Sequence, residues 1–141
     1  MSISAEELSL IANSYSEAEK AVMEQYGMTA IEVDVMLFLA NNPQFDTAAE
    51  IVSVRRIAKS HVSMAVSKLT ARGFLKKLRD ENDRKKIHLR ITENASPMVR
   101  DAQQFQKDFR TSILKGFSEE EKHQMEMFVD RIARNIRDFI G

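Results

Sequence analysis

The sequence predicts a mainly α-helical fold with a small β-hairpin, in the α+β class. Three observations carry this expectation. Amphipathic stripes with helical spacing fill most of the 141 residues, residues 86–91 alternate between polar and apolar side chains with residues 74–79 as their natural partner, and cations concentrate around these segments. A chain of this length can bury a real core, so we expect a single domain over residues 1–141.

The first helix is predicted over residues 5–26. Its apolar side chains step by three and four residues, which is typical of a heptad-like seam that includes Leu8, Ile11 and Tyr15. Gly27 ends the helix, because a residue without Cβ adopts the left-handed conformation freely.

Two shorter helices are predicted next. The first begins at Thr29, which forms a capping box with Glu32, and ends at Asn41-Asn-Pro43 because proline cannot donate a helical hydrogen bond. The second is capped by Asp46 or Thr47. With the helix that follows, it forms a helix-turn-helix.

The fourth predicted helix covers about residues 59–72 and has two different faces. Val62, Val66 and Leu69 form an apolar stripe that can be buried, and Gly73 ends the helix. The other face presents small polar groups and cations that can approach and hydrogen-bond another molecule. Its members are Lys59, Ser60, His61, Ser63, Met64, Ser67, Lys68 and Arg72.

Residues 74–91 are predicted to form a β-hairpin, with a loop rich in turn formers and in cations, among them Arg84, Lys85 and Lys86. We interpret Asp83 as a structural residue that pairs with a nearby cation. A helix beside such a hairpin is the layout of a winged helix-turn-helix, in which the helix reads the DNA major groove and the hairpin, or wing, reaches the backbone or minor groove.

Two long amphipathic helices are predicted after the wing. The first has an irregular start, because Thr92 and Ser96 compete as its N-cap, and it runs to about Gly116. Ser118 opens the last helix through a capping box with Glu121. The apolar side of this last helix includes Phe128, Ile132, Ile136, Phe139 and Ile140.

The terminal helices carry more apolar surface than one small winged-helix core can cover, so we expect a homodimer. The chain then divides into a DNA-binding lobe over residues 28–92 and a helical dimerisation lobe over residues 1–27 and 93–141. A two-fold axis would place two recognition helices about 34 Å apart, as a palindromic site requires. The predicted interface residues are Leu8, Ile11, Tyr15, Phe128, Ile132, Ile136, Phe139 and Ile140.

The basic side chains are concentrated in one part of a chain that is neutral overall. Both signs contribute 21 side chains, but residues 55–90 hold twelve Lys and Arg against three acids, a local net charge of +9. Such segregation provides a surface that attracts phosphate. A merely solvated surface is the alternative for the serine-rich helix face and for the tip of the wing.

Other classes of function find no support in the residues. The chain lacks cysteine, which suits a reducing compartment. It also has no glycine-rich phosphate-binding loop and no recognisable pair of a catalytic nucleophile and its base. His61, His88 and His123 match no metal-ligand spacing, and His88 is expected on an outward strand face. We therefore expect no enzyme, metal or cofactor. The absence of a leader pattern and of a long apolar run predicts a cytoplasmic protein that does not associate with a membrane.

Four segments, taken in order, resemble the MarR (multiple antibiotic resistance regulator) family of bacterial transcription factors. They are Met28-Thr-Ala-Ile-Glu32, Lys59-Ser-His-Val-Ser63, Leu69-x-x-x-Gly73-Phe-Leu75, and Asp83-Arg-Lys85 followed by Leu89-Arg-Ile-Thr92. Lys85 stands where the family's Asp-x-Arg wing signature has arginine. The resemblance implies a dimer with a small aromatic or anionic effector, held in a crevice between the dimerisation helices and the reading head.

The sequence therefore favours a homodimeric transcriptional regulator, a repressor that binds double-stranded DNA at a palindromic operator and is released by a small molecule. The recognition helix over about residues 59–72 would lie in the major groove. The wing over about residues 74–91 would contact the minor groove or the backbone. The alternative is a winged helix that binds other proteins and has no specific operator.

Overall fold

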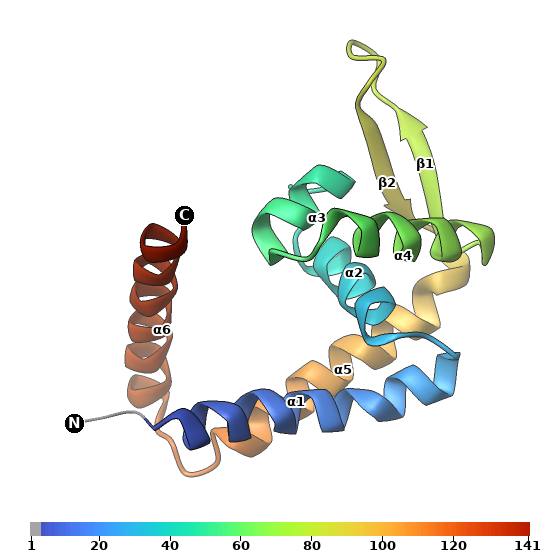
Figure 1. The fold of residues 1–141 in the computed structure, drawn as a ribbon. Helices are drawn as coiled ribbons and strands as arrows, with labels where there is room; N and C mark the ends of the chain where they lie inside the picture. Colours follow the sequence, from blue (N-terminus) through green and yellow to red (C-terminus); the bar gives the residue numbers. More distant parts are fainter. Residues whose placement is uncertain (1–3) are drawn as a thin grey trace. The chain divides into compact units, whose positions relative to one another are not determined.

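A computed structural model of the protein describes residues 4–141, which form six α-helices and one antiparallel hairpin. The helices are α1 (Ala5–Tyr26), α2 (Ala30–Asn41), α3 (Ala48–Arg55), α4 (Lys59–Ala71), α5 (Ser96–Ile113) and α6 (Glu119–Ile140) (Figure 1). The strands are β1 (Leu75–Arg79) and β2 (Ile87–Ile91). The predicted fold class, mainly helical with a small hairpin, is confirmed.

The ends of the first three helices follow local signals in the sequence. Gly27 adopts the left-handed conformation after α1, with φ 59°. At the start of α2 the Glu32 N–H donates to the Thr29 hydroxyl at 3.2 Å, and the Glu32 carboxylate accepts from the Thr29 N–H at 3.0 Å. Of the two candidates for the cap of α3, Thr47 is the residue used, since its hydroxyl accepts from the Glu50 N–H at 3.2 Å.

The chain after the wing begins with the irregular turn that the sequence predicts. Glu93–Ala95 forms a short 3-10 helix, and Ser96 is the first residue of α5 rather than its cap. Thr92 also does not cap this turn, because its hydroxyl donates to the Gly73 carbonyl and ties the end of β2 to the start of the hairpin. Ser118 opens α6 with the expected capping box.

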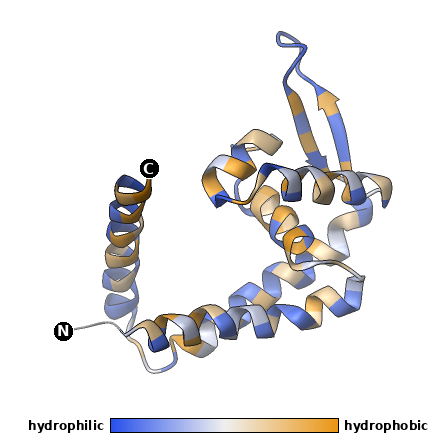
Figure 2. Ribbon diagram, in the orientation of Figure 1, coloured by the Kyte–Doolittle hydropathy of each residue, from blue (hydrophilic) through white to orange (hydrophobic). Residues whose placement is uncertain are grey.

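The core that supports the winged helix is built around α2. This helix contacts α1, α4 and β2, and most of its side chains are buried, so it is apolar almost all round (Figure 2). The predicted apolar stripe of α4 faces this core, with Val62 and Leu69 fully buried. Burying a side chain of this size stabilises the fold by about 1.5–3 kcal/mol. The burial of the stripe fixes which face of α4 remains outside.

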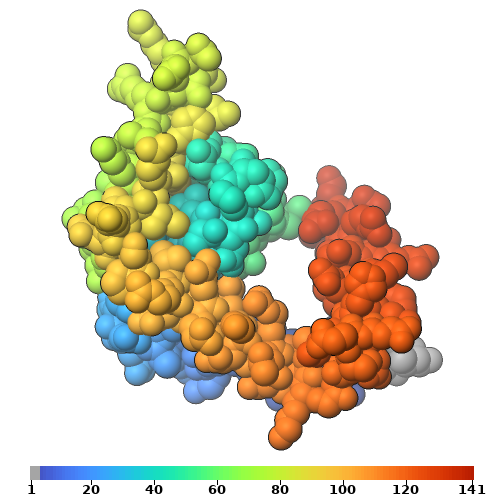
Figure 3. Space-filling model, turned by 180° about the vertical axis from the view of Figure 1, so that it is seen from behind, coloured from blue at the N-terminus to red at the C-terminus, as the bar shows by residue number. Residues whose placement is uncertain are grey.

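The hairpin is held at its base and is exposed at its tip. Its register runs from the pair Leu75 and Ile91 to the pair Arg79 and Ile87. Leu75 and Leu89 are buried where the hairpin meets the core. The loop extends beyond the rest of its unit, as the space-filling view shows (Figure 3).

The chain divides into two compact units, Met1–Lys107 and Asp108–Gly141. The first unit includes α1 and most of α5 as well as the winged helix, because Val22, Met98 and Ala102 are buried in the same core. The two lobes predicted from the sequence, which are defined by function, stay a prediction.

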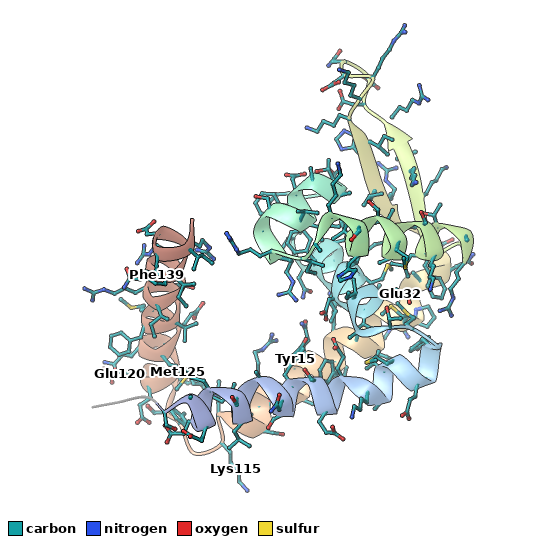
Figure 4. All side chains as sticks on the ribbon, in the orientation of Figure 1. Tyr15, Glu32, Lys115, Glu120, Met125 and Phe139 are labelled. Carbon is teal, nitrogen blue, oxygen red and sulfur yellow. The ribbon has the colours of Figure 1, made fainter. Side chains whose placement is uncertain are left out.

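The second unit contains the end of α5 and the whole of α6. None of the described residues of α6 is buried. Most of its large apolar side chains are exposed. Phe128 is 59% exposed and Phe139, which is labelled in Figure 4, is 89% exposed. Across residues 4–141, no helix combines the length and the hydrophobicity needed to cross a membrane.

Candidate nucleic-acid interface

The outer face of α4 presents the polar and cationic side chains that the sequence singled out. Seven of the eight predicted residues on this helix share that face and are exposed: Lys59, Ser60, His61, Ser63, Met64, Ser67 and Lys68. They lie opposite the buried stripe, and α4 contains no acidic side chain. The face can therefore approach a polyanion without charge repulsion.

The first turn of α4 has no side-chain cap. Its N-cap is Ala58, which has no oxygen to accept a hydrogen bond from the helix N–H groups. The start of a helix carries a partial positive charge and favours anions such as phosphate. Lys59, the first residue of α4, adds a full charge at the same end.

Arg72 lies at the C-terminal end of α4, but its guanidinium is occupied within the protein. Nη2 donates to the Tyr26 carbonyl at 2.6 Å, Nη1 donates to the Gly27 carbonyl at 3.1 Å, and the group lies 4.7 Å from the centre of the Phe74 ring. The carbonyls at the end of α1 lack helical partners, which favours a cation there. We therefore assign Arg72 a structural role instead of the DNA contact expected from the sequence.

The wing loop is folded by aspartates that accept backbone hydrogen bonds. Asp80 Oδ2 accepts from the N–H groups of Asn82 and Asp83 at 3.0 and 2.9 Å. Asp83 Oδ1 accepts from the Lys85 N–H at 3.0 Å, and no ion pair within residues 4–141 involves Asp83. The expected pairing with a cation is corrected to this backbone bond, because an N–H two residues away is within reach at little entropic cost.

The three cations of the wing tip, Arg84, Lys85 and Lys86, are exposed. The aspartates hold the backbone of the loop and leave these side chains at its surface. The wing thus provides a second cationic surface beside the outer face of α4.

The structure brings together a cluster at His88 that the sequence does not predict. His88 is partly buried and bridges two carboxylates instead of facing outward: Nδ1 lies 2.8 Å from Asp46 Oδ1 and Nε2 lies 2.7 Å from Asp80 Oδ1. The bond to Asp80, followed by the bond to Asp46, raises the pKa of His88, and the same histidine lowers the pKa of Asp80. No spacing rule identifies this cluster, because Asp46 is far away in the chain.

A second cluster of charged groups lies between α1, α2 and α3. Glu19 is buried, and its Oε2 atom has no hydrogen-bond partner. Burial, together with a hydrogen bond to Asp34 and the charge of Asp34, raises the pKa of Glu19 to about 8. Arg55 lies 3.6 Å from Asp34, so this cation of the basic segment is paired inside the protein. The described residues contain no cluster arranged to hold a metal ion.

The helix-turn-helix of α3 and α4, with the wing beside it, defines a winged helix-turn-helix protein. Residues 26–86, which contain α2, α3, α4 and the first strand and loop of the wing, match the sequence model of the MarR family. The chain thus has the fold of a winged helix-turn-helix protein, and the resemblance to the MarR family of transcriptional regulators found in the sequence is confirmed over these residues. Regulators of this family are DNA-binding proteins and not enzymes.

Similar proteins support the same family. The HTH-type transcriptional regulator PecS of Dickeya dadantii is 23% identical over 131 residues, which cover 92% of this chain and 79% of PecS. A MarR family transcriptional regulator from Listeria monocytogenes, solved in complex with a 26mer DNA, has a TM-score of 0.87 at 19% identity and covers 98% of this chain and 91% of its own. BpsR of Bordetella bronchiseptica, described as regulated in its DNA binding by 6-hydroxynicotinic acid, has a TM-score of 0.70 at 17% identity, covering 89% of each chain.

Proposed function

We propose that this protein is a homodimeric repressor that binds a palindromic operator in double-stranded DNA. The observation that carries the proposal is the outer face of α4, which is exposed, free of acids and flanked by an exposed cationic wing. The DNA complex of the Listeria monocytogenes relative supports it, since that protein has the same fold. Phosphate contacts would supply most of the affinity, and base contacts the specificity.

The two cationic surfaces have different parts in this proposal. Ser63, Ser67 and Lys68, in the middle of the outer face of α4, contact base edges in the major groove, because small polar groups allow close approach. Arg84 and Lys85 contact phosphates or the minor groove from the wing. Arg84 enters the groove more deeply, since its planar guanidinium suits a narrow groove better than an ammonium does.

The proposed dimer rests on apolar side chains that remain exposed in a single chain. Leu8 and Ile11 of α1 are 56% and 59% exposed, and Ile136 of α6 is 51% exposed. A second copy could cover such stripes in an interface of the isologous type. Tyr15 also packs in its own chain, 5.1 Å from the Phe105 ring, so we place it at the margin of this interface.

The same proposal assigns residues 28–92 to DNA binding, and residues 1–27 and 93–141 to dimerisation. The sharing of one core by α1, the winged helix and α5 supports mechanical coupling between these lobes. The effect of 6-hydroxynicotinic acid on BpsR supports a small aromatic or anionic effector that releases this protein from its operator.

Selection of bound sequences from random duplexes tests the proposed function. We expect enrichment of a palindrome whose half-sites are about one helical turn apart, since two recognition helices are related by a two-fold axis. Titration against random duplexes at low salt provides the second measurement, and binding there should weaken steeply as salt increases. A protein that bound no duplex at low salt would instead be a winged helix that binds other proteins.

A further inference from the structure

His88 joins three segments of the DNA-binding unit through one side chain. It belongs to β2, Asp46 precedes the cap of α3, and Asp80 follows β1 and begins the wing loop. A backbone hydrogen bond lies next to the first contact, because the Leu89 N–H donates to the Asp46 carbonyl at 2.7 Å. The imidazole thus connects the start of the helix-turn-helix to the loop that carries the wing cations.

The two contacts require the charged form of the ring. A neutral imidazole has one N–H and one lone pair, so it can donate to only one of two carboxylates, whereas the imidazolium donates to both. At 2.7–2.8 Å the unprotonated nitrogen would point a lone pair at a carboxylate oxygen. Deprotonation therefore breaks one of the two bonds and separates the wing loop from Asp46.

Charged side chains near the His88 ring come from the hairpin and from the start of α3. Lys76 of β1 and Arg90 of β2 lie on the strand face of His88 by alternation and register, and Lys86 immediately precedes β2. Glu50 of α3 accepts hydrogen bonds from the N–H groups of Asp46 and Thr47 and holds the loop that carries Asp46. The bridged carboxylates are thus the two nearest anionic partners, and the other strand cations repel the ring.

We propose that His88 is a positioning residue for DNA binding, which holds the wing cations in register with α4 by bridging Asp46 and Asp80. The inference rests on the proposed function, because it assumes that α4 and the wing contact one duplex together. It assigns a role to a side chain that does not touch DNA. It also ties operator affinity to the protonation of a single histidine.

The direction of the pH effect follows from the contacts. Both carboxylates favour the imidazolium, so the bridge is complete below the ordinary histidine pKa of 6.5 and is lost as the pH rises through the raised pKa of His88. Operator affinity should therefore be constant at low pH and decrease on the alkaline side. Disruption of one charged hydrogen bond in each protomer should reduce the affinity about tenfold.

The experiment compares the full-length protein with four variants by measuring operator affinity from pH 6 to pH 9. His88→Gln removes the charge, whereas His88→Arg keeps a charge that does not titrate and a fork that can reach two carboxylates. His61→Gln removes the histidine on the outer face of α4, and His123→Gln is the matched control in α6. Hydrogen exchange of the Leu89 amide reports the bridge without DNA, and thermal unfolding reports global stability.

We expect His88→Gln to bind about tenfold more weakly at pH 6 and to lose the alkaline decrease, with faster exchange at Leu89. His88→Arg should bind at pH 9 as the wild type does at pH 6. His123→Gln should keep the wild-type profile, and His61→Gln should bind more weakly but keep the decrease.

Two results would overturn this inference. The first is a His88→Gln protein with wild-type affinity and pH profile, which would leave the proposed DNA binding intact. The second is a loss of affinity in His88→Gln that tracks a loss of global stability and is not rescued by His88→Arg. A wild-type protein that bound no duplex would overturn the proposed function as well.

Discussion

The carbonyl oxygen of Tyr26 accepts a hydrogen bond from Nη2 of Arg72 at 2.6 Å, which joins the last turn of α1 to the end of α4. The contact of the same guanidinium with the Phe74 ring extends the junction to the first residue after the α4–β1 turn. The position of α4 along its axis is therefore linked to α1.

Arg72→Ala should reduce the free energy of unfolding by about 1–2 kcal/mol, because it removes charged hydrogen bonds from carbonyls at a helix end. It should also weaken binding to the operator and to a scrambled duplex by similar factors, since the Arg72 guanidinium is held at the end of α1. Chemical denaturation and binding assays measure the two effects. Lys68→Ala is the control, because this exposed side chain should change binding without changing stability. A change of base preference in Arg72→Ala would contradict the structural assignment.

Alanine substitution of Ser63, Ser67 or Lys68 should cost about 1–3 kcal/mol of binding for each base edge that the variant no longer contacts. The preference should relax at one position in each half-site and stay unchanged elsewhere. Competition among duplexes with single base changes measures this pattern. Uniform weakening on all duplexes would place the contacts of these residues on phosphates instead.

Wing substitutions should behave differently from substitutions on the outer face of α4. Arg84→Ala and Lys85→Ala should weaken binding to all DNA sequences more evenly. Each should also reduce the slope of log K against log salt by about 0.9 for each phosphate that the variant no longer neutralises. In a symmetric dimer each substitution affects two phosphates. Salt titrations on the operator and on a scrambled duplex provide the measurement. Unchanged affinity and slope in both variants would mean that the wing does not touch DNA.

The sequence was informative wherever a structural signal is local. The caps at Thr29 and Ser118, the end of α1 at Gly27 and the buried stripe of α4 each depend on residues within one or two helical turns. Such signals are sufficient to identify the winged helix and the outer face of α4. They also predicted the irregular start of α5.

The parts that the sequence did not reveal depend on contacts between distant residues. The sequence predicts Arg72 as a DNA contact on the polar face of its helix, because its partners at the end of α1 are more than forty residues away in the chain. His88 alternates with cations along β2 and was expected on an outward face, but Asp46 and Asp80 meet it in space. The buried carboxyl of Glu19 likewise depends on the packing of α1 against α2.

The raised pKa of Glu19 predicts that stability decreases as the pH rises. Below the ordinary value of 4.5 the folded and unfolded states are both protonated at this group. Between 4.5 and the folded-state pKa of about 8 the unfolded state loses the proton first, so the free energy of unfolding decreases over this window and levels off above it. Chemical denaturation should therefore show that the contribution of Glu19 to the free energy of unfolding is smaller at pH 8 than at pH 5.

Glu19→Gln isolates the contribution of Glu19, because it keeps the shape and removes the titration. The decrease between pH 5 and pH 8 should become smaller in this variant, and the protein should be more stable than the wild type at pH 8. Glu17→Gln, on an exposed face of α1, is the matched control. An unchanged pH profile in Glu19→Gln would show that Glu19 is ionised in the folded protein.

The exposed apolar side of α6 predicts the outcome of a single charge placed on it. Ile136 is 51% exposed within one chain, and a second copy would bury it in the proposed dimer. Ile136→Asp should then cost several kcal/mol of association, because an unpaired carboxylate would be buried in an apolar interface. Specific operator binding should be lost with the dimer, since one recognition helix cannot read both half-sites.

Sedimentation of Ile136→Asp at micromolar concentration measures the oligomeric state, and Asn135→Asp adds the same charge at a neighbouring exposed polar position of α6. Asn135→Asp should remain dimeric and bind the operator. Thermal unfolding separates loss of the dimer from loss of the fold, because Ile136 belongs to none of the buried core. An Ile136→Asp protein that stayed fully dimeric would exclude this side of α6 from the interface and return the dimer proposal to the exposed seam of α1.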